Sequence, residues 1–211
     1  MRNTFALLAG LLGVDSAMAG YIHRKCQFPD VQQNFDTEAY LGNWYEQYRD
    51  KSLPYEHGTC TTAGYSFRDD GDIRVLNNDY IDSKQEWGGG VGKAFLVDPS
   101  KDEGYLKVKF VVFQPNADYK VIATDYETYT VIYTCFALPL HVYGQEFVWV
   151  LTRDTEMSAE IEAEVRLIIK NAVPLYDLEE NWQKTKQGGD CPYQTAPTSV
   201  EDFKFNELTM Y

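Results

Sequence analysis

The chain has 211 residues, 44% of them hydrophobic and 15% aromatic, a composition that excludes a disordered protein and suits one globular domain. The formal net charge of -13 is unfavourable for contact with phosphate backbones, so nucleic acid is not expected as a partner. An acidic surface is explained more simply by the solubility of an exported protein than by a functional acidic patch.

Residues 1–19 are typical of a secretory signal peptide. Arg2 supplies the positively charged start, residues 5–14 form an apolar run, and Ala17-Met18-Ala19 is a cleavage site of the usual kind. This run is too short to cross a bilayer, and no later segment approaches the length of a membrane span. We therefore expect a secreted, extracellular protein whose residues 20–211 form a single domain.

Residues 20–40 are expected to form an extended arm that ends in a short helical turn capped by Asp36. The first strand is predicted over 44–49. Its alternation places three side chains on the inner face, namely Trp44, Glu46 and Tyr48. Residues 51–58 contain a proline and a glycine and form a long connection, so this loop is a candidate lid.

Further strands are predicted at 60–67, 73–77, 91–97, 105–113, 119–124, 129–136 and 146–152. Asp69-Asp70-Gly71 is a strong hairpin signal, and Gly88-Gly89-Gly90 is expected to bend the chain before the strand at 91–97. Within 105–113, Leu106, Val108 and Phe110 alternate with two lysines. This pattern indicates an antiparallel strand with one buried and one solvated face.

One helix is predicted over 158–172, with Ser158 as its cap and Pro174 beyond its end. Its apolar stripe consists of Ile161, Val165, Ile168 and Ala172. The tail 173–211 is expected to be irregular. Taken together, the elements predict an all-β fold: an eight-stranded antiparallel up-and-down β-barrel over 42–153 with one C-terminal α-helix packed outside. The interior of such a barrel is large enough for one small ligand.

Four cysteines lie in the exported part, at Cys26, Cys60, Cys135 and Cys191. An even number in an oxidising compartment predicts two disulfides, and the residues alone leave three connectivities open. The sequence contains no CxxC motif and no Cys/His cluster, so no metal site is expected.

Three short motifs resemble those of the lipocalins: Gly42-Asn43-Trp44, Thr124-Asp125-Tyr126 and Thr152-Arg153. They occur in order, at the expected separations and on predicted strands. Residues 25–46 resemble the start of the apolipoprotein D-like branch. Gln187-Gly188 with Cys191-Pro192-Tyr193 resembles the tail of the crustacyanin-like branch. The resemblance covers nearly all of residues 25–193.

The resemblance implies that Cys26 pairs with Cys135 and Cys60 with Cys191. It also implies a structural role for Gly42, Trp44, Thr124, Asp125, Tyr126 and Arg153, with the Arg153 guanidinium over the Trp44 indole. Residues matching its pocket positions, together with others on the same predicted faces, give the expected ligand-binding set: Glu46, Tyr48, Tyr65, Asn77, Val108, Phe110, Tyr119, Phe147 and Trp149.

The implied function is extracellular binding and transport of a small hydrophobic molecule: a carotenoid, bilin, sterol, retinoid or fatty acid. No cofactor is expected beyond a bound chromophore or lipid. Ile81 and Gln114 replace an Arg and a Met of the apolipoprotein D-like branch, so the identity of the ligand does not carry over. Assembly into homo- or hetero-oligomers stays open.

Two other functions are compatible with the sequence. A lipocalin-type isomerase or synthase would use a cysteine in the barrel, but the expected disulfides leave no thiolate for it. Catalytic triads, HExxH motifs and phosphate-binding loops are absent, and Glu46 is read as a buried hydrogen-bonding group rather than an acid–base catalyst. The barrel could instead be a scaffold that acts through its loops.

Overall fold

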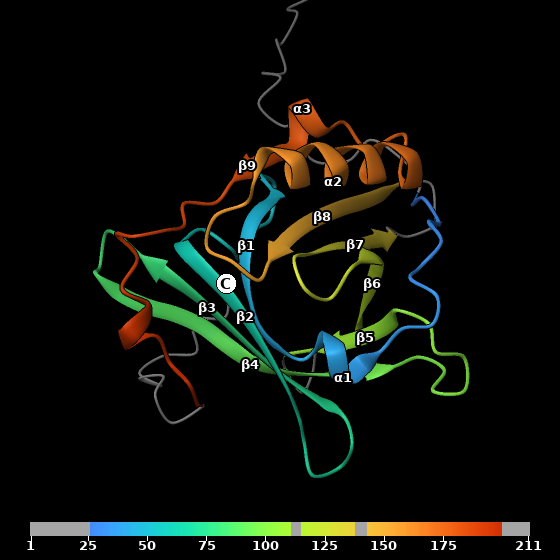
Figure 1. Ribbon diagram of the computed structural model, residues 1–211, viewed down its shortest axis with the longest axis horizontal. Helices are drawn as coiled ribbons and strands as arrows, with labels where there is room; N and C mark the ends of the chain where they lie inside the picture. The colour runs from blue at the N-terminus through green and yellow to red at the C-terminus, as the bar shows by residue number, and fades with distance from the viewer. Residues whose placement is uncertain (1–25, 111–114, 138–142, 200–211) are drawn as a thin grey trace, which may run out of the picture.

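The computed structural model describes residues 26–110, 115–137 and 143–199, so the predicted signal peptide and Gln114 lie outside the described residues. Eight strands form the barrel: β1 (Gly42–Asp50), β2 (Thr59–Phe67), β3 (Ile73–Ile81), β4 (Glu86–Leu96), β5 (Tyr105–Lys109), β6 (Ala117–Thr124), β7 (Tyr129–Ala137) and β8 (Gly144–Thr152). Each strand pairs antiparallel with the next, and β1 pairs with both β2 and β8. The predicted closed up-and-down barrel is confirmed (Figure 1).

The predicted helix is α2 (Ala159–Ala172), which lies outside the barrel along β7 and β8 (Figure 1). The Ser158 side chain caps it by accepting a hydrogen bond from the Ile161 amide. Val165 and Ile169 are fully buried, whereas Ile168 is only partly buried. The buried stripe therefore includes Ile169, which the predicted stripe omitted.

Shorter elements complete the chain. They are α1 (Thr37–Tyr40), α3 (Leu178–Asn181), β9 (Trp182–Lys184) and the 3-10 turn η2 (Tyr193–Thr195). Asp36 caps α1 as predicted. β9 was not predicted. It pairs with the end of β1, from Tyr48 to Asp50, just where the pairing of β1 with β8 stops at Tyr48–Val150.

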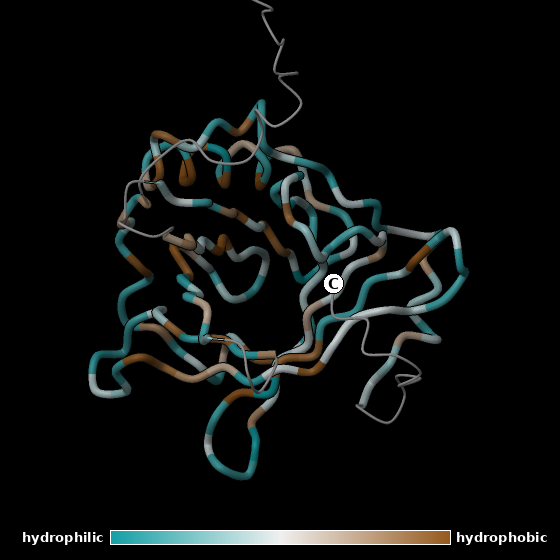
Figure 2. The backbone as a smooth tube through the Cα atoms, turned by 180° about the vertical axis from the view of Figure 1, so that it is seen from behind, coloured by the Kyte–Doolittle hydropathy of each residue, from teal (hydrophilic) through white to brown (hydrophobic). Residues whose placement is uncertain are grey.

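Two hydrophobic clusters lie on opposite sides of the barrel wall. The inner cluster fills the floor of the barrel and includes Phe35, Tyr40, Trp44, Tyr65, Val75, Leu106, Val121 and Leu151. The outer cluster lies between the wall and α2 and includes Tyr48, Val131, Val148, Val150, Val165 and Ile169. Figure 2 shows hydrophobic residues along the strands and α2, with hydrophilic residues at the tip of the β2–β3 hairpin.

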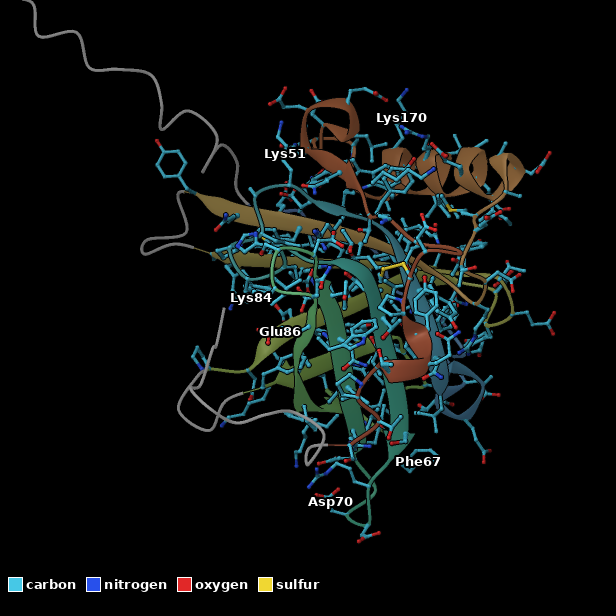
Figure 3. All side chains as sticks on the ribbon, turned by 90° about the vertical axis from the view of Figure 1, so that its left-hand side faces the viewer. Lys51, Phe67, Asp70, Lys84, Glu86 and Lys170 are labelled. Carbon is cyan, nitrogen blue, oxygen red and sulfur yellow. A yellow bond between two sulfur atoms is a disulfide. The ribbon has the colours of Figure 1, made fainter. Side chains whose placement is uncertain are left out.

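The strand directions define two ends of the barrel. β1 starts at the closed end, beside α1, and the β2–β3 hairpin with Phe67 and Asp70 extends from this end (Figure 3). The β3–β4 turn with Lys84 and Glu86 lies at the far end of the same strands. Loop 51–58 connects β1 to β2 at this second, open end.

The glycine run Gly88-Gly89-Gly90 does not bend the chain before a new strand, as the sequence suggested, but lies within β4 and pairs with β3. Gly89 has φ +135, and a Cβ there would lie 2.0 Å from the carbonyl oxygen of Asn77. Glycine is required because the backbones approach too closely for any side chain. The run therefore lengthens β4 rather than interrupting it.

A β-bulge in β1 corrects the predicted position of Tyr48. The register of β1 against β8 shifts between Glu46 and Tyr48, so the strict two-residue alternation fails there. Tyr48 belongs to the outer cluster and stacks on Trp182 with ring centroids 4.4 Å apart. Its assignment to the ligand-binding set was wrong. Arg49, which regular alternation would have turned outward, lies beside Glu46 instead.

Candidate functional site

The floor of the barrel is built around Trp44 and Arg153. Trp44 is fully buried, and its indole N–H donates to the carbonyl of Tyr40 at 3.0 Å. The guanidinium carbon of Arg153 lies 3.7 Å from the ring centroid of Trp44, as the resemblance implies. The same guanidinium donates to the carbonyls of Tyr126, Asn43 and Ala39 at 2.9, 3.0 and 2.9 Å. Arg153 thus ties three chain segments across the closed end.

Gly42 and the Thr124-Asp125-Tyr126 motif also belong to this floor. Gly42 has φ +96, and a Cβ there would lie 3.2 Å from Nη1 of Arg153. Thr124 donates to the carbonyl of Tyr129 at 2.8 Å, and Asp125 accepts from the amide of Tyr129 at 2.9 Å. These bonds fix the turn between β6 and β7, so the motif has a structural role at the closed end.

The two disulfides join Cys26 to Cys135 and Cys60 to Cys191, which is the pairing that the resemblance implies. The first attaches the N-terminal arm to β7, and the second attaches the C-terminal tail to β2. All four cysteines of the sequence are therefore oxidised.

Above the floor, three tyrosine hydroxyls form a chain. Tyr119 lies within 2.9 Å of Tyr40 and 2.8 Å of Tyr65, and Tyr40 lies 3.2 Å from the hydroxyl of Thr130. Burial raises the pKa of Tyr40 to about 12 and raises the pKa of Tyr65 and of Tyr119 well above the ordinary value. The chain therefore consists of neutral hydroxyl groups that satisfy one another.

Most of the expected ligand-binding residues share the inner surface. Val108, Tyr119 and Trp149 pack against the inner cluster and stay partly exposed. Phe147 is buried beside Trp149, with ring centroids 6.1 Å apart. Phe110 follows β5 at the open end, where its ring lies over Gly92 and is 41% exposed.

Asn77 lies on the same face of β3 as Val75, which belongs to the inner cluster. Its Oδ1 is buried and has no hydrogen-bond partner among the described residues. A buried, unpaired amide oxygen carries a cost of about 1–3 kcal/mol unless water or a ligand donates to it. This atom is therefore a point where the interior can accept a hydrogen bond.

The open end contains a group of buried charges that strict alternation did not predict. Glu46 accepts hydrogen bonds from Arg49 at 3.0 Å and from Thr185 at 2.5 Å. The Glu46 and Arg49 side chains are only 4% and 3% exposed. Arg49 also donates to the carbonyl of Gly58 at 2.9 Å. Glu46 thus lies inside as predicted, but as half of an ion pair.

Loop 51–58 places a second carboxyl group in the same region. Glu56 is partly buried and accepts a hydrogen bond from Nε1 of Trp149 at 2.8 Å. Leu53 of the loop is buried, and the amide of Gly58 donates to Asp79 at 3.0 Å. The sequence predicted a lid at these residues but gave no sign that Glu56 turns inward.

Burial is the main cause of the altered protonation of this group. Burial, together with the negative charge of Glu46, raises the pKa of Glu56 to about 8. Burial also raises the pKa of Glu46, against the opposing charge of Arg49. The pKa of Asp79 is raised by burial too. The open end thus holds three carboxyl groups in a region that disfavours their ionised forms.

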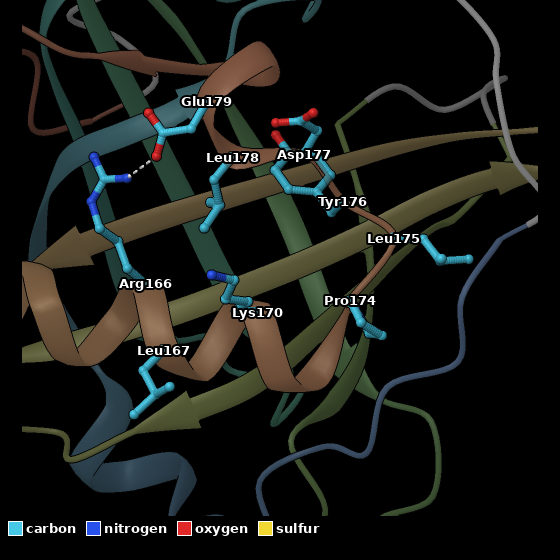
Figure 4. Close-up of a pocket in the computed structure, with 9 residues that line it drawn as sticks. All are labelled: Arg166, Leu167, Lys170, Pro174, Leu175, Tyr176, Asp177, Leu178 and Glu179. Carbon is cyan, nitrogen blue, oxygen red and sulfur yellow. Dashed lines mark hydrogen bonds and ion pairs between the residues drawn. The ribbon is translucent and has the colours of Figure 1, made fainter.

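A second concave region lies on the outer surface, between α2 and the connection to α3 (Figure 4). Its walls include Leu167 and Leu175, which are 60% and 53% exposed, and the ion pair of Arg166 with Glu179 at 3.1 Å. Among its charged groups, Arg166 pairs with Glu179, and Asp177 caps α3. The unpaired amide oxygen and the buried carboxyl groups lie in the barrel, so the barrel is the candidate site.

No cluster of His, Cys, Asp and Glu side chains within the described residues is arranged to hold a metal ion. No helix in that part of the chain has the length and apolarity of a membrane span.

Comparison with known proteins places the chain in a family. The lipocalin-like domain family matches residues 35–180. Apolipoprotein D of Macaca fascicularis is 35% identical over 160 residues, which cover 73% of this chain and 80% of that protein.

Two solved structures share the fold. Lobster apocrustacyanin A1 has a TM-score of 0.64 at 23% identity and covers 76% of this chain and 84% of its own. Insecticyanin from the tobacco hornworm Manduca sexta has a TM-score of 0.69 at 20% identity, and the match covers 81% of this chain and 90% of the insecticyanin chain. The barrel, its Trp44–Arg153 floor and these matches agree, and the chain belongs to the lipocalin-like family.

Proposed function

We propose that the protein is a secreted, non-catalytic carrier that binds one small hydrophobic molecule in the upper half of its barrel. The observation that carries the proposal is the change in exposure along the inner face of β5. Leu106 is 2% exposed at the floor, Val108 is partly exposed, and Phe110 is 41% exposed at the open end. The closed end is thus filled by its own side chains, while the inner wall nearer the open end, or mouth, of the barrel stays accessible.

The surfaces offered there are mainly apolar and aromatic. Val108 and Trp149 supply apolar contact, with Phe147 buried beside Trp149, and Tyr65 and Asn77 supply polar groups for orientation. A ligand that buries about 300 Å² of apolar surface gains on the order of 7 kcal/mol before the costs of association. Carotenoids, bilins, sterols, retinoids and fatty acids are the ligand classes we propose.

Purified native protein tests this function directly. Its organic extract should contain a hydrophobic molecule in up to equimolar amount, identified by absorption spectrum and mass. Stripped protein should then quench or enhance its tryptophan fluorescence on titration with members of these classes, and a Trp149→Phe variant should lose most of that signal. An empty extract together with no response to the whole panel would contradict the carrier function and favour the loop scaffold.

The enzyme alternative is tested separately. A cysteine-dependent isomerase or synthase requires a thiolate, and the four cysteines form two disulfides. We expect thiol titration of the denatured, non-reduced protein to find no free thiol. A stoichiometric free thiol would restore that mechanism as a candidate.

A further inference from the structure

The hydrogen bond from Trp149 to Glu56 gives information on what the mouth of the barrel binds. Trp149 packs against the inner cluster and stays partly exposed, and its indole N–H points to an oxygen atom of Glu56 at 2.8 Å. Glu56 belongs to loop 51–58, not to a strand. An oxygen atom of a loop, rather than of the barrel wall, therefore occupies the position at which a ligand oxygen would meet the indole N–H.

The titratable groups around this position are mainly acidic. Glu46, Glu56 and Asp79 contribute three carboxyl groups, and Arg49 is the guanidinium that lies among them. The donors of Arg49 bind Glu46, Thr61 and the carbonyl of Gly58. This cation is thus already paired with protein oxygens.

The neighbouring titratable groups of loop 51–58 do not offset this excess of acidic groups. The charges of Glu56 and Glu46 both raise the pKa of Tyr55, after burial, so this phenol is neutral. His57 is exposed and bonds the carbonyl of Pro54, and its influence on Asp79 lowers the pKa of that carboxyl less than burial raises it. The inner position next to Trp149 therefore faces mainly acidic groups.

The protonation of Glu56 shows that the mouth of the barrel disfavours a negatively charged group. Glu56 keeps its proton to about pH 8, because burial and the charge of Glu46 both oppose ionisation. A group at this position is thus held in its uncharged form at neutral pH. The carboxylate of a ligand would meet the same opposition.

Resting on the proposed carrier function, we infer that the mouth selects hydrophobic ligands whose terminal oxygen is uncharged, such as ketones, aldehydes and alcohols, over ligands that end in a carboxylate. The ligand oxygen replaces Glu56 as the acceptor for Trp149 when loop 51–58 moves aside. A carboxylate at this position would be repelled by Glu46 and would find Arg49 already paired. Fatty acids, which the sequence left among the candidates, are disfavoured on this argument.

Matched ligand pairs test the inference. Dissociation constants are measured at pH 7 by tryptophan fluorescence for retinol, retinal and retinoic acid, and for hexadecanol and hexadecanoate. We expect each uncharged ligand to bind at least about tenfold more tightly than its acid. Acids that bind equally or more tightly would overturn the inference and leave the carrier function intact. Failure of both members of every pair would also overturn the inference, whereas the carrier function itself fails only if the extract is empty and the whole ligand panel gives no response.

Two variants locate the cause of the selectivity. Glu46→Gln releases Arg49 from its ion pair and should bring the ratio of the acid and alcohol dissociation constants to about one or below. Glu56→Gln keeps an acceptor for Trp149 but removes the titrating group, and should reduce the ratio severalfold.

Glu86→Gln is the matched control. It removes a carboxylate from the β3–β4 turn, where the side chain is 56% exposed, and should leave the ratio unchanged. Thermal unfolding checks that each variant is folded, and Glu56→Gln carries the test if Glu46→Gln does not fold. An unchanged ratio in the folded mouth variants, or a similar loss in Glu86→Gln, would overturn the assignment to these carboxyl groups.

Discussion

The guanidinium of Arg153 lies over the indole of Trp44 with its carbon atom 3.7 Å from the ring centroid, although the two residues come from opposite ends of the barrel sequence. Trp44 lies near the start of β1, and Arg153 directly follows the end of β8, so the contact forms where the barrel closes on itself. It combines a cation–π contact with hydrogen bonds to three backbone carbonyls at 2.9, 3.0 and 2.9 Å and a longer one, at 3.4 Å, to the carbonyl of Tyr40.

We predict that Arg153→Ala lowers the free energy of unfolding by about 2–4 kcal/mol, because several carbonyls lose a charged donor at once. Arg153→Lys should recover less than half of this, since an ammonium group cannot serve three carbonyls and stack on the ring together. Urea denaturation followed by circular dichroism measures both. A lysine variant as stable as the wild type would show that only the charge matters.

The protonation of Glu56 predicts how stability depends on pH. Its pKa is raised from 4.5 to about 8 in the folded protein. Between these values the unfolded chain has released a proton that the folded protein keeps, so raising the pH favours unfolding. The penalty is absent below about pH 4.5 and complete above about pH 8.

Glu56→Gln removes this titration. We therefore expect the variant to gain stability relative to the wild type as the pH rises from about 5 to about 8, in urea denaturation at several pH values. Glu86→Gln, which changes an exposed carboxylate, should show no such trend. If the free energies of unfolding of wild type and Glu56→Gln differ by the same amount at every pH in this range, then Glu56 ionises normally in the folded protein.

A side chain of the C-terminal tail bridges β1 and β2 where their own pairing ends. The regular pairs end at Tyr45–Thr62, and Nε2 of Gln187 then donates to the carbonyls of Glu46 and Thr61, both at 2.7 Å. We predict that Gln187→Leu lowers the free energy of unfolding, measured by urea denaturation, by about 1–3 kcal/mol, because both carbonyls lose their donor. Gln183→Leu changes an exposed residue of β9 and should cost less than about 0.5 kcal/mol. Equal costs would contradict the bridging role.

The two disulfides should differ in what their loss releases. Removing either is expected to cost about 2–5 kcal/mol, since the chain separations of 131 and 109 residues are similar. The double change of Cys60 and Cys191 to Ala frees the tail from β2. Trypsin should then cleave after Lys184 and Lys186 faster than in the matched Cys26 and Cys135 double variant. The same cleavage rate in both would show that hydrogen bonds alone hold the tail.

Much of the fold follows from local sequence. The Asp36 and Ser158 caps and the Asp-Asp-Gly hairpin each carry their own signal and occur as predicted, and the strand predicted over 105–113 is present as β5, which ends at Lys109. The Trp44–Arg153 contact and the disulfide pairing came from the resemblance to the lipocalins. Residue spacing alone leaves such long-range pairings open.

The arrangement of side chains at the mouth of the barrel does not follow from local sequence. The bulge in β1 adds one residue to the strand without any glycine or proline to mark it, so regular alternation placed Tyr48 inside and Arg49 outside. Glu56 sits in a loop, where no periodicity indicates direction. β9 is only three residues long and depends on the edge that the bulged β1 offers.

The same bulge allows a strand to neutralise its own charge. In a regular strand, residues three positions apart point to opposite faces, so Glu46 and Arg49 could not meet. With one extra residue between them they form an ion pair at 3.0 Å. This short stretch can therefore enter the apolar interior as a dipole rather than as two ions that must find counter-charges elsewhere. Deleting Gln47 would separate them and leave a lone carboxylate facing the ligand.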